Sequence, residues 1–476
     1  MTRTKIIATL GPASLSDESI VALIKAGVDI FRLNMSHGER DTHRSTIRRL
    51  KKLPARHGLE PVGILADLSG PKIRVGRLAG GSVKLMEGAG VTLHSRGTGD
   101  DESTVSSLFV SYAGLGKGLK KGAKVLIDDG MLELKVVSAR RGEVACKVVK
   151  GGTLKEHKGV NFPGMPLELP SMTDKDEADL EMLLGEGVDY IALSFVREAG
   201  DVEALKEKIR KAGSDVPVIA KIERPEAVKN IRGIVKVSDA VMVARGDLGV
   251  EMAPELVPPL QKRLIRLCNE QRKPVITATQ MLESMIWNPR PTRAEASDVA
   301  GAVFDGTDAL MLSGETAEGR YPEAAVRIMD RIAREAERHL KRPDDKEGGI
   351  TGTAEAIAYS ACNSAAELGA KAVICFTRTG STALLMSKFR PDTAIIAATP
   401  DAGSFKRMRL YFGVTPVMTK LAPSTDRMIK EVERSALARG LVREGDTVVV
   451  TLGVPVALKA PTNLMKVHRV GERFGR

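Results

Sequence analysis

The chain has 476 residues, of which 43% are hydrophobic, 28% charged and 3% aromatic, and its net charge is +12. At roughly 150 residues per domain this length predicts about three domains, and the hydrophobic fraction excludes a disordered chain. The basic surplus attracts phosphates or nucleic acid, although a solvated basic surface would give the same count. So few aromatic residues argue against a platform that stacks single-stranded nucleic acid.

The sequence predicts a cytoplasmic location. The N-terminus lacks the apolar run and small-residue cleavage site of a signal peptide. No stretch reaches the ~18 uncharged apolar residues that a membrane span needs. The cysteines are far apart and form no C-x-x-C pair, which disfavours zinc and disulfides. They are Cys146, Cys268, Cys362 and Cys375.

From the first residues, short apolar runs alternate with segments of helical period such as 17–26 and 202–212. Continuous apolar runs are typical of parallel strands, because both faces of a parallel sheet are covered. The predicted strands are 5–10, 28–33, 62–65, 190–195, 216–220, 240–244, 274–278 and 309–312. These strand–helix units predict an α/β fold, a (β/α)₈ TIM barrel.

One barrel loop carries an insertion. After Asp67 the pattern changes to period-two alternation with many glycines, which indicates strands. The predicted strands are 83–85, 124–127, 132–136 and 144–148. Asp128-Asp129-Gly130 predicts a hairpin turn, since glycine tolerates positive φ. We therefore expect a small β-barrel-like domain at 70–166 inserted in a barrel made of 1–69 and 167–342.

A second α/β pattern begins beyond a Pro/Asp/Gly-rich linker at 342–349. Its predicted helices are 354–368, 382–389 and 426–439, and its predicted strands are 372–376, 394–398, 447–452 and 465–470. The alternation predicts a C-terminal doubly wound α/β domain over 343–476.

Barrel enzymes place their catalytic groups at the carboxyl ends of the strands. Here all the predicted barrel strands end in polar residues or in glycine, which tolerates unusual backbone conformations. They are Thr9, Gly11, Arg32, Asn34, Ser36, Asp67, Ser194, Lys221, Glu223, Arg245, Asp247, Thr279, Gln280, Ser313 and Glu315. Any one of them could be an ordinary capping or loop residue, but their joint placement predicts a catalytic mouth.

Lys221 and Glu223 lie on one face of a strand, since side chains alternate with period two, and Asp247 follows the next strand. Two carboxylates from neighbouring strands, with room for substrate oxygens and water, suit Mg²⁺, although an ion pair would be the plainer interpretation. Arg32 and Arg74 supply planar forks for phosphate or carboxylate. The cluster suits phosphoryl transfer, whose transition state spreads negative charge. The sequence has no Walker-type or kinase glycine-rich loop, so a nucleotide would bind in another way.

At these residues the chain resembles the pyruvate kinase family, along essentially its whole length. The resemblance is carried by TKIIATLGPAS, IFRLNMSHG, DLSGPKIRVG, HKGVNFPG, AKIERPEAV, VMVARGDLGVE and TATQMLESMIWNPRPTRAEASDVAGAVFDGTDALMLSGETAEGRYP. It implies the last step of glycolysis: the phosphoryl group of phosphoenolpyruvate moves to ADP with Mg²⁺, or Mn²⁺ in its place, giving pyruvate and ATP. It also implies a homotetramer, with no nucleic-acid or membrane partner.

The resemblance assigns a role to each motif residue. Lys221 would stabilise the transition state, Arg32 would contact the phosphate, and Glu223 and Asp247 would bind Mg²⁺. The substrate carboxylate would be held by Gly246, Asp247 and Thr279. The nucleotide contacts would be Asn34, Ser36, His37, Arg74 and Lys158. Thr279 and Ser313, through water, are the candidates for protonating the enolate, and closure of the inserted domain would exclude bulk water.

Lys72 departs from members of the family that require K⁺, which carry glutamate at this position. The equivalents of the K⁺ cage are Asn34, Ser36, Asp67 and the carbonyl of Leu68, beside Lys72. A lysine ammonium supplies the same positive charge and repels a monovalent cation, so we expect activity without K⁺. A Lys72 side chain that points to solvent is the alternative.

The loop Thr377-Arg378-Thr379-Gly380-Ser381-Thr382 follows a predicted strand and opens a predicted helix. Hydroxyl and N–H groups at a helix N-terminus bind anions, although an ordinary capped turn has the same pattern. In the family this loop receives the phosphate of a sugar-phosphate effector, so we expect allosteric activation by a phosphorylated metabolite. The family's second phosphate loop is not recognisable in 453–463, which leaves the identity of the effector open.

Two other functions fit parts of the pattern. Another Mg²⁺-dependent barrel enzyme acting on phosphoenolpyruvate or a related oxo acid would use similar carboxylates, but would not need Lys158, His37 or the inserted domain. A non-catalytic protein that binds nucleic acid or sugar phosphates would use the basic surface. The intact Lys221, Glu223 and Asp247 speak against it.

Overall fold

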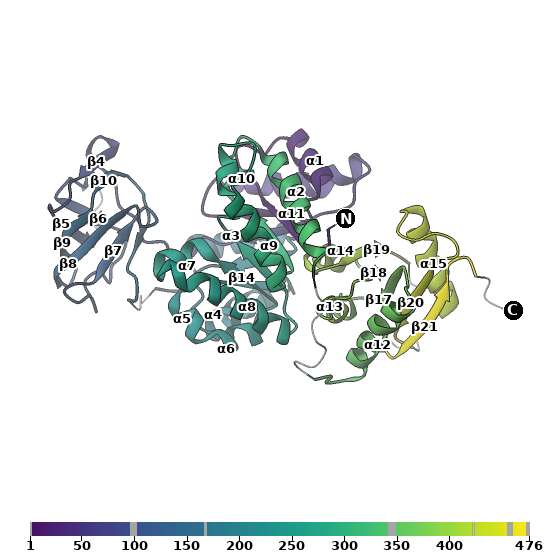
Figure 1. The fold of residues 1–476 in the computed structure, drawn as a ribbon. Coiled ribbons are helices and arrows are strands. Elements are labelled where there is room, and N and C mark those ends of the chain that lie inside the picture. The colour runs from purple at the N-terminus through teal and green to yellow at the C-terminus, as the bar shows by residue number, and fades with distance from the viewer. Residues whose placement is uncertain are drawn as a thin grey trace.

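The computed structural model describes residues 2–95, 102–165, 169–340, 349–420, 422, 424–454 and 460–472. Three bodies lie in a row: the inserted β domain, the barrel and the C-terminal α/β domain (Figure 1). The predicted boundaries at 166 and 342, and most of the predicted linker, lie outside the described residues. Among the described residues, every helix is too short or too polar to cross a membrane.

The central body is a closed barrel of parallel strands in the order β1-β16-β15-β14-β13-β12-β3-β2, which confirms the predicted fold. The strands are β1 (Lys5–Thr9), β2 (Ile30–Asn34), β3 (Gly63–Asp67), β12 (Tyr190–Leu193), β13 (Val218–Ile222), β14 (Ala240–Ala244), β15 (Val275–Ala278) and β16 (Ala309–Leu312). The sequence placed β13 two residues too early. Pro217 has no N–H to donate to a neighbouring strand, so pairing starts at Val218 and Lys221 lies inside the strand.

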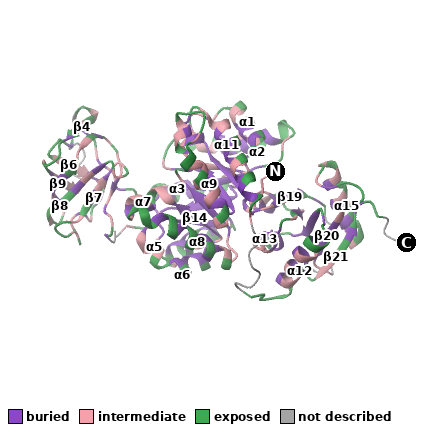
Figure 2. Ribbon diagram, viewed as in Figure 1, coloured by how far each residue is buried: buried purple, intermediate pink, exposed green. Residues whose placement is uncertain are grey.

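Helices cover the outside of the barrel, and the strands between them are buried (Figure 2). The longer helices are α1 (Asp17–Ala26), α2 (Arg40–Arg56), α3 (Asp174–Glu186), α4 (Ala199–Lys211), α8 (Val257–Glu270), α9 (Arg293–Asp305) and α11 (Pro322–Glu337). Shorter ones follow the strand ends: α5 (Pro225–Lys229), α6 (Ile231–Val237), α7 (Arg245–Glu251) and α10 (Gly314–Ala317). Two of them, α7 and α10, begin at Arg245 and directly after Ser313, residues that the sequence placed at the mouth, so their first turns line it.

The inserted β domain has two sheets around one apolar core. Its strands are β4 (Ser82–Leu85), β5 (Gly90–Ser95), β6 (Ser107–Val110), β7 (Lys124–Ile127), β8 (Leu132–Arg140), β9 (Glu143–Lys150), β10 (Gly152–Lys155) and β11 (Val160–Asn161). The predicted hairpin joins β7 to β8, with φ of 54° at Asp128, 52° at Asp129 and 83° at Gly130. Aspartate tolerates this left-handed conformation better than most residues, which explains why both can precede the glycine.

The C-terminal body is a sheet in the order β19-β18-β17-β20-β21 with an apolar cluster on each face, as a doubly wound domain requires. Its strands are β17 (Ala372–Phe376), β18 (Ala394–Thr399), β19 (Val414–Met418), β20 (Thr447–Leu452) and β21 (Leu464–Arg469). Its helices are α12 (Thr353–Glu367), α13 (Ser381–Lys388), α14 (Ala402–Arg407) and α15 (Thr425–Ala438). Only β21 is antiparallel among these strands.

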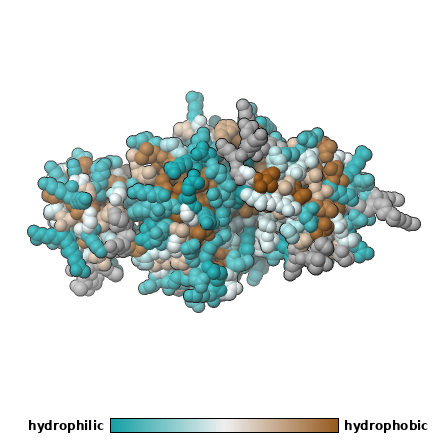
Figure 3. All heavy atoms as spheres, turned by 90° about the horizontal axis from the view of Figure 1, so that it is seen from below, coloured by the Kyte–Doolittle hydropathy of each residue, from teal (hydrophilic) through white to brown (hydrophobic). Residues whose placement is uncertain are grey.

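The C-terminal domain docks on the amino-terminal end of the barrel, opposite the mouth. Leu410 packs into the apolar cluster inside the barrel, and Tyr190 donates to the carbonyl of Arg407 at 2.8 Å. Asp308, fully buried just before β16, pairs with Lys388 and Arg390 of the C-terminal domain. The face seen in Figure 3 is largely hydrophilic, with separate apolar patches.

Candidate active site

Lys221 lies at the centre of the barrel mouth. Its Nζ lies 2.7 Å from Glu223 Oε1 and 3.1 Å from Asp67 Oδ1, and it donates to Ser194 Oγ at 2.8 Å. Burial alone would lower the pKa of Lys221, but the carboxylates of Asp67, Glu223 and Asp247 outweigh burial and raise this pKa. The ammonium group therefore stays charged at neutral pH.

Arg32 holds the other side of Asp67. Its Nε and Nη2 lie 2.8 and 2.7 Å from Asp67 Oδ2, and its Nη1 donates to Thr9 Oγ1 at 3.1 Å. Burial would raise the pKa of Asp67, but Lys221 and Arg32 lower it below the ordinary value. Asp67 is thus a fixed anion that orients two cations at the mouth, and two neighbouring cations suit a phosphate group.

Glu223 and Asp247 are the carboxylates available to a metal ion. Glu223 Oε2 accepts the N–H of Phe195 at 2.9 Å, while Asp247 lies at the start of α7 on the accessible side of the mouth. The enclosure of the mouth and the negative charge of Glu223 raise the pKa of Asp247 to about 6, against the opposite effects of Lys221 and Lys72. A divalent cation between the two carboxylates would relieve their repulsion.

The donor set fits Mg²⁺. The candidate ligands are carboxylate oxygens, which hard cations prefer to sulfur or imidazole. Among the described residues no group of three or more His, Cys, Asp and Glu side chains gathers at one point. The protein would therefore supply two ligands, and substrate oxygens and water would supply the rest, as is usual for Mg²⁺.

Thr279 and Gly246 meet beside the metal ligands. The N–H of Gly246 donates to Thr279 Oγ1 at 2.7 Å, and this hydroxyl donates to the carbonyl of Ala278 at 2.6 Å. Both Thr279 and the following Gln280 have positive φ, 68° and 53°. The N–H of Gly246 and the hydroxyl of Thr279 thus lie side by side, and a carboxylate that accepted from both would take the place of the partners they have here.

Ser313 also reaches the mouth. Its Oγ is buried and has no hydrogen-bond partner among the described residues, which leaves it free to bind an ordered water or a ligand. Glu315, by contrast, has a structural role. Fully buried, it accepts the N–H of Ser313 at 2.8 Å and of Leu282 at 2.9 Å and so joins the loops after β16 and β15.

Lys72 interacts with the cluster although its side chain is accessible at the mouth. Burial by the surrounding protein and the charge of Lys221 lower the pKa of Lys72, while Asp247, Glu223 and Asp67 raise it. The charge of Lys72 thus interacts with the charges of the cluster, while its side chain stays accessible to solvent.

Among the K⁺-cage equivalents, the oxygens of Asp67, Asn34 and the Leu68 carbonyl have partners within the protein. Lys221 and Arg32 bind the two oxygens of Asp67, and the carbonyl of Leu68 accepts from Ser194 Oγ at 2.8 Å. Asn34 Oδ1 accepts the N–H of Ser36 at 3.2 Å. These oxygens are therefore held in place by neighbouring groups of the protein.

The predicted nucleotide contacts come from two bodies. Asn34, Ser36 and His37 follow β2 on the barrel, and burial together with Lys72 and Arg74 lowers the pKa of His37. Arg74 and Lys158 lie on the inserted domain, where Arg74 Nη1 donates to the carbonyl of His157 at 2.8 Å and Lys158 Nζ pairs with Asp128 at 2.8 Å. A nucleotide that touched both groups would bridge the two bodies.

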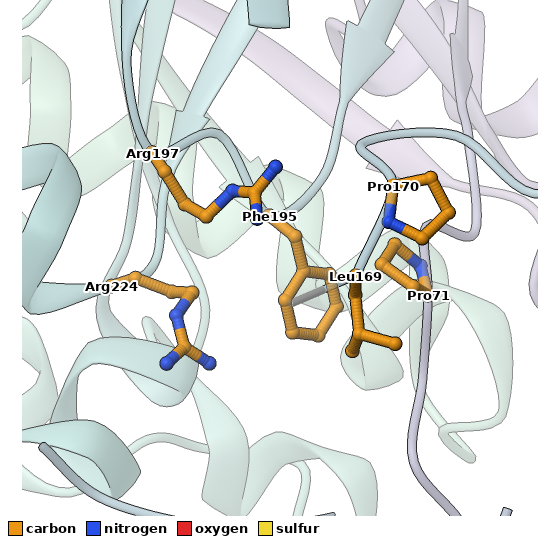
Figure 4. Close-up of a pocket in the computed structure, with 6 residues that line it drawn as sticks. All are labelled: Pro71, Leu169, Pro170, Phe195, Arg197 and Arg224. Carbon is orange, nitrogen blue, oxygen red and sulfur yellow. The ribbon is translucent and has the colours of Figure 1, made fainter. Parts of the chain in front are cut away.

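A small pocket lies where the inserted domain joins the barrel (Figure 4). The two connecting segments supply Pro71, Leu169 and Pro170, and the barrel supplies Phe195, Arg197 and Arg224. Arg224 directly follows the candidate metal ligand Glu223, and its buried Nη2 donates to the carbonyl of Met165 at 3.0 Å.

Glu251 extends the contact of Arg224 with the inserted domain. Its Oε1 lies 3.5 Å from Arg224 Nη1 and accepts Asn161 Nδ2 at 2.9 Å. Barrel side chains thus bind the segment that leads from the inserted domain back to the barrel, at Asn161 and Met165. Sequence reasoning missed these contacts, because they join residues from distant parts of the chain.

The loop 377–382 joins β17 to α13 in the C-terminal domain. Gly380, with φ of 87°, donates its N–H to Thr377 Oγ1 at 3.0 Å, and Thr379 Oγ1 donates to Ser381 Oγ at 3.2 Å. The hydroxyls of Thr382 and Thr462 lie 2.7 Å apart. The loop therefore contacts the C-terminal segment, part of which (455–459) lies outside the described residues.

An α/β barrel with an inserted β domain, and with an ammonium, a guanidinium and carboxylates converging at its mouth, has the groups that a phosphotransferase needs. Two sequence profiles match the chain: "Pyruvate kinase, barrel domain" at residues 1–326 and "Pyruvate kinase, alpha/beta domain" at residues 355–468. The chain therefore belongs to the pyruvate kinase family.

Individual relatives agree with these profiles. The chain is 44% identical to a pyruvate kinase of Staphylococcus saprophyticus, over all of this chain and 82% of that protein. It is 47% identical to pyruvate kinase 2 of Synechocystis, over all of this chain and 80% of that protein. The solved structure of a pyruvate kinase from Cryptosporidium parvum superposes with a TM-score of 0.93 at 37% identity, covering 98% of this chain and 96% of that one.

Proposed function

We propose that this phosphotransferase moves the phosphoryl group of phosphoenolpyruvate to ADP without K⁺, as the last step of glycolysis. The bond between phosphorus and the enol oxygen breaks, and a bond to a terminal β-phosphate oxygen of ADP forms. The enolate that remains takes one proton at its methylene carbon and becomes pyruvate. The observation that carries the proposal is the Lys221 ammonium within 3.1 Å of both Glu223 and Asp67, beside Arg32, at one barrel mouth.

Lys221 and Arg32 would bind the migrating phosphoryl group. Both cations are already oriented by Asp67, so little reorganisation is needed when negative charge spreads over the equatorial oxygens. Glu223 and Asp247 would hold Mg²⁺, or Mn²⁺ in its place, which when bound neutralises charge on the phosphoryl and carboxylate oxygens.

Gly246 and Thr279 would orient the substrate. The N–H of Gly246, the backbone of Asp247 and the Thr279 hydroxyl would receive its carboxylate. Ser313 Oγ, which lacks a protein partner among the described residues, would with Thr279 position the water that delivers the proton to the enolate.

ADP would bind between the barrel and the inserted domain. Asn34, Ser36 and His37 would contact it from the barrel, and Arg74 and Lys158 from the inserted domain. A nucleotide held on both sides draws the two bodies together and excludes water, so the phosphoryl group reaches ADP rather than solvent.

Lys72 would replace the monovalent ion. The effect of Asp247, Glu223 and Asp67 on the pKa of Lys72, and the protein partners of Asp67 and of the Leu68 carbonyl, support this role. A K⁺ ion entering here would meet an ammonium group at short range.

Regulation would reside in the C-terminal domain. The loop 377–382 would take the phosphate of an activating metabolite on its hydroxyl and N–H groups, with the side chain of Arg378 exposed beside them. By similarity to the family, we propose a cytoplasmic homotetramer.

A coupled assay that follows pyruvate tests the proposed reaction. With phosphoenolpyruvate, we expect pyruvate to form only when ADP and Mg²⁺ are both present, and KCl to leave the rate unchanged. Adding a panel of sugar phosphates tests the effector loop. Pyruvate formation that does not depend on ADP, or a large activation by KCl, would refute the proposed reaction or its K⁺ independence respectively.

A further inference from the structure

Arg245 begins α7 directly after β14, and none of the roles above uses it. We infer that Arg245 is a positioning residue: its guanidinium holds the loop after β15 so that the Thr279 hydroxyl faces the substrate carboxylate. The inference rests on the proposed carboxylate site, and it adds a residue on which the geometry of that site depends.

The loop after β15 has an unusual backbone. Thr279 and Gln280 are consecutive non-glycine residues with φ of 68° and 53°. Positive φ is uncommon outside glycine, and for a β-branched residue such as Thr279 it is a genuine outlier. Such a conformation persists only where surrounding contacts fix it, and it often occurs where a binding group must be held in place.

One side chain, that of Arg245, binds the backbone of this loop at three points. Arg245 Nη2 donates to the carbonyl of Thr279 at 2.7 Å and to that of Gln280 at 3.3 Å, and Arg245 Nε donates to the carbonyl of Ala278 at 3.3 Å. Three consecutive carbonyl oxygens are thus bound by one planar fork. Only arginine carries enough donors in fixed geometry to do this.

The guanidinium group of Arg245 is itself held in place by side chains of two helices. Its Nη1 lies 2.7 Å from Asp298 Oδ1 on α9 and 3.3 Å from Gln261 Oε1 on α8, and Gln261 is anchored in turn to Asp305 at 3.0 Å. Two helices therefore set the position of Arg245. The arrangement orients the fork toward the loop and leaves it little freedom to rotate.

The Arg245 side chain and backbone are linked to the proposed carboxylate site in two ways. Arg245 precedes Gly246, whose N–H contacts Thr279 Oγ1 at 2.7 Å, and Arg245 also binds the carbonyl of Thr279. Both groups that would receive the carboxylate are thus linked to one residue. Losing the fork would let the loop relax toward negative φ and would turn the hydroxyl away from Gly246.

The test compares Arg245→Lys with Arg263→Lys, an exposed position on α8, in the full-length protein. We expect kcat/KM for phosphoenolpyruvate to fall by about 10²-fold in Arg245→Lys, since small misplacements of a binding group have effects of this size. KM for ADP should stay unchanged, because the nucleotide contacts lie elsewhere. Arg263→Lys should behave like the wild type.

Two further readouts separate positioning from a loss of stability. The affinity for oxalate in the presence of Mg²⁺ should fall in Arg245→Lys, while the affinity for ADP does not. Millimolar guanidinium should restore part of the activity of Arg245→Ala, because it can occupy the place of the missing fork. Equal losses for both substrates, unchanged oxalate affinity, or no rescue would overturn the inference. If the wild type itself made no pyruvate from phosphoenolpyruvate and ADP, the proposed function would fail instead.

Discussion

At the scale of single residues, Lys221 is the centre of the candidate site, where Asp67, Glu223 and Ser194 surround its ammonium group. The rule that catalytic groups lie at the carboxyl ends of barrel strands pointed to Lys221, Glu223 and Asp247 without knowledge of any contact. It could not show that Ser194 accepts from Lys221, or that Glu315 only braces the loops. Both outcomes depend on side chains from other strands, which the local pattern does not contain.

Substitution of Lys221 is the most direct test of a single residue in the candidate site. In Lys221→Ala, Arg32 alone remains beside Asp67, and the positive charge nearest to Glu223 is lost. We expect kcat to fall by about 10²–10³-fold, the usual effect of removing one donor to a developing charge. Lys262→Ala, at an exposed position on α8, is the matched control. Full activity of Lys221→Ala in the coupled assay would exclude a role in transfer.

Lys72→Glu should convert the enzyme to K⁺ dependence. The change removes the positive charge near Asp67 and Asp247 and adds a carboxylate that can attract a cation. We expect low activity in K⁺-free buffer and recovery on adding KCl, measured with tetramethylammonium chloride as the ionic-strength control. A variant as active as the wild type without K⁺ would show that Lys72 does not replace the ion.

At the scale of elements, strands were predicted to within two residues in the barrel, because buried parallel strands are continuous apolar runs. The inserted domain was harder to predict. The strands β5, β6, β10 and β11 were not predicted, and three of them, β6, β10 and β11, have only four, four and two residues. The hairpin between β7 and β8 was predicted correctly, since its turn residues alone specify the conformation.

The junction between the inserted domain and the barrel leads to a further prediction. Arg224→Ala removes the hydrogen bond to the Met165 carbonyl and leaves Glu251 buried with Asn161 as its remaining polar contact. We expect a less firmly held inserted domain, so that water competes with ADP and pyruvate exceeds ATP among the products. The ratio of pyruvate to ATP measures this effect, with Arg232→Ala on the exposed face of α6 as the control. A ratio of one in Arg224→Ala would contradict this role of the junction.

At the scale of the whole molecule, buried charges at the amino-terminal end of the barrel join it to the C-terminal domain. Asp308, fully buried, faces both Lys388 and Arg390 from the C-terminal domain, and its Oδ2 also accepts the N–H of Val275 at 2.8 Å. Sequence patterns divided the chain into these bodies, but they could not predict this interface. It pairs residues about eighty positions apart whose local surroundings are ordinary.

Asp308→Asn tests this interface. The amide can still accept from Val275, but it leaves the charges of Lys388 and Arg390 uncompensated in a buried place. Breaking such a pair usually costs about 3–5 kcal/mol, so we expect a clearly lower unfolding temperature. Asp392→Asn, at an exposed pair with Arg3, should change it little. Equal thermal stability of the two variants would show that the buried charges do not hold the domains together.

The account as a whole depends on one transfer, and ³¹P NMR follows it directly. Phosphoenolpyruvate, ADP and Mg²⁺ are mixed with the full-length enzyme in K⁺-free buffer, and the phosphorus signals are followed with time. We predict that the phosphoenolpyruvate signal is replaced by the γ-phosphate signal of ATP in equal amount, and that Lys221→Ala removes this conversion. The appearance of inorganic phosphate in place of ATP, or conversion only after KCl is added, would contradict the account.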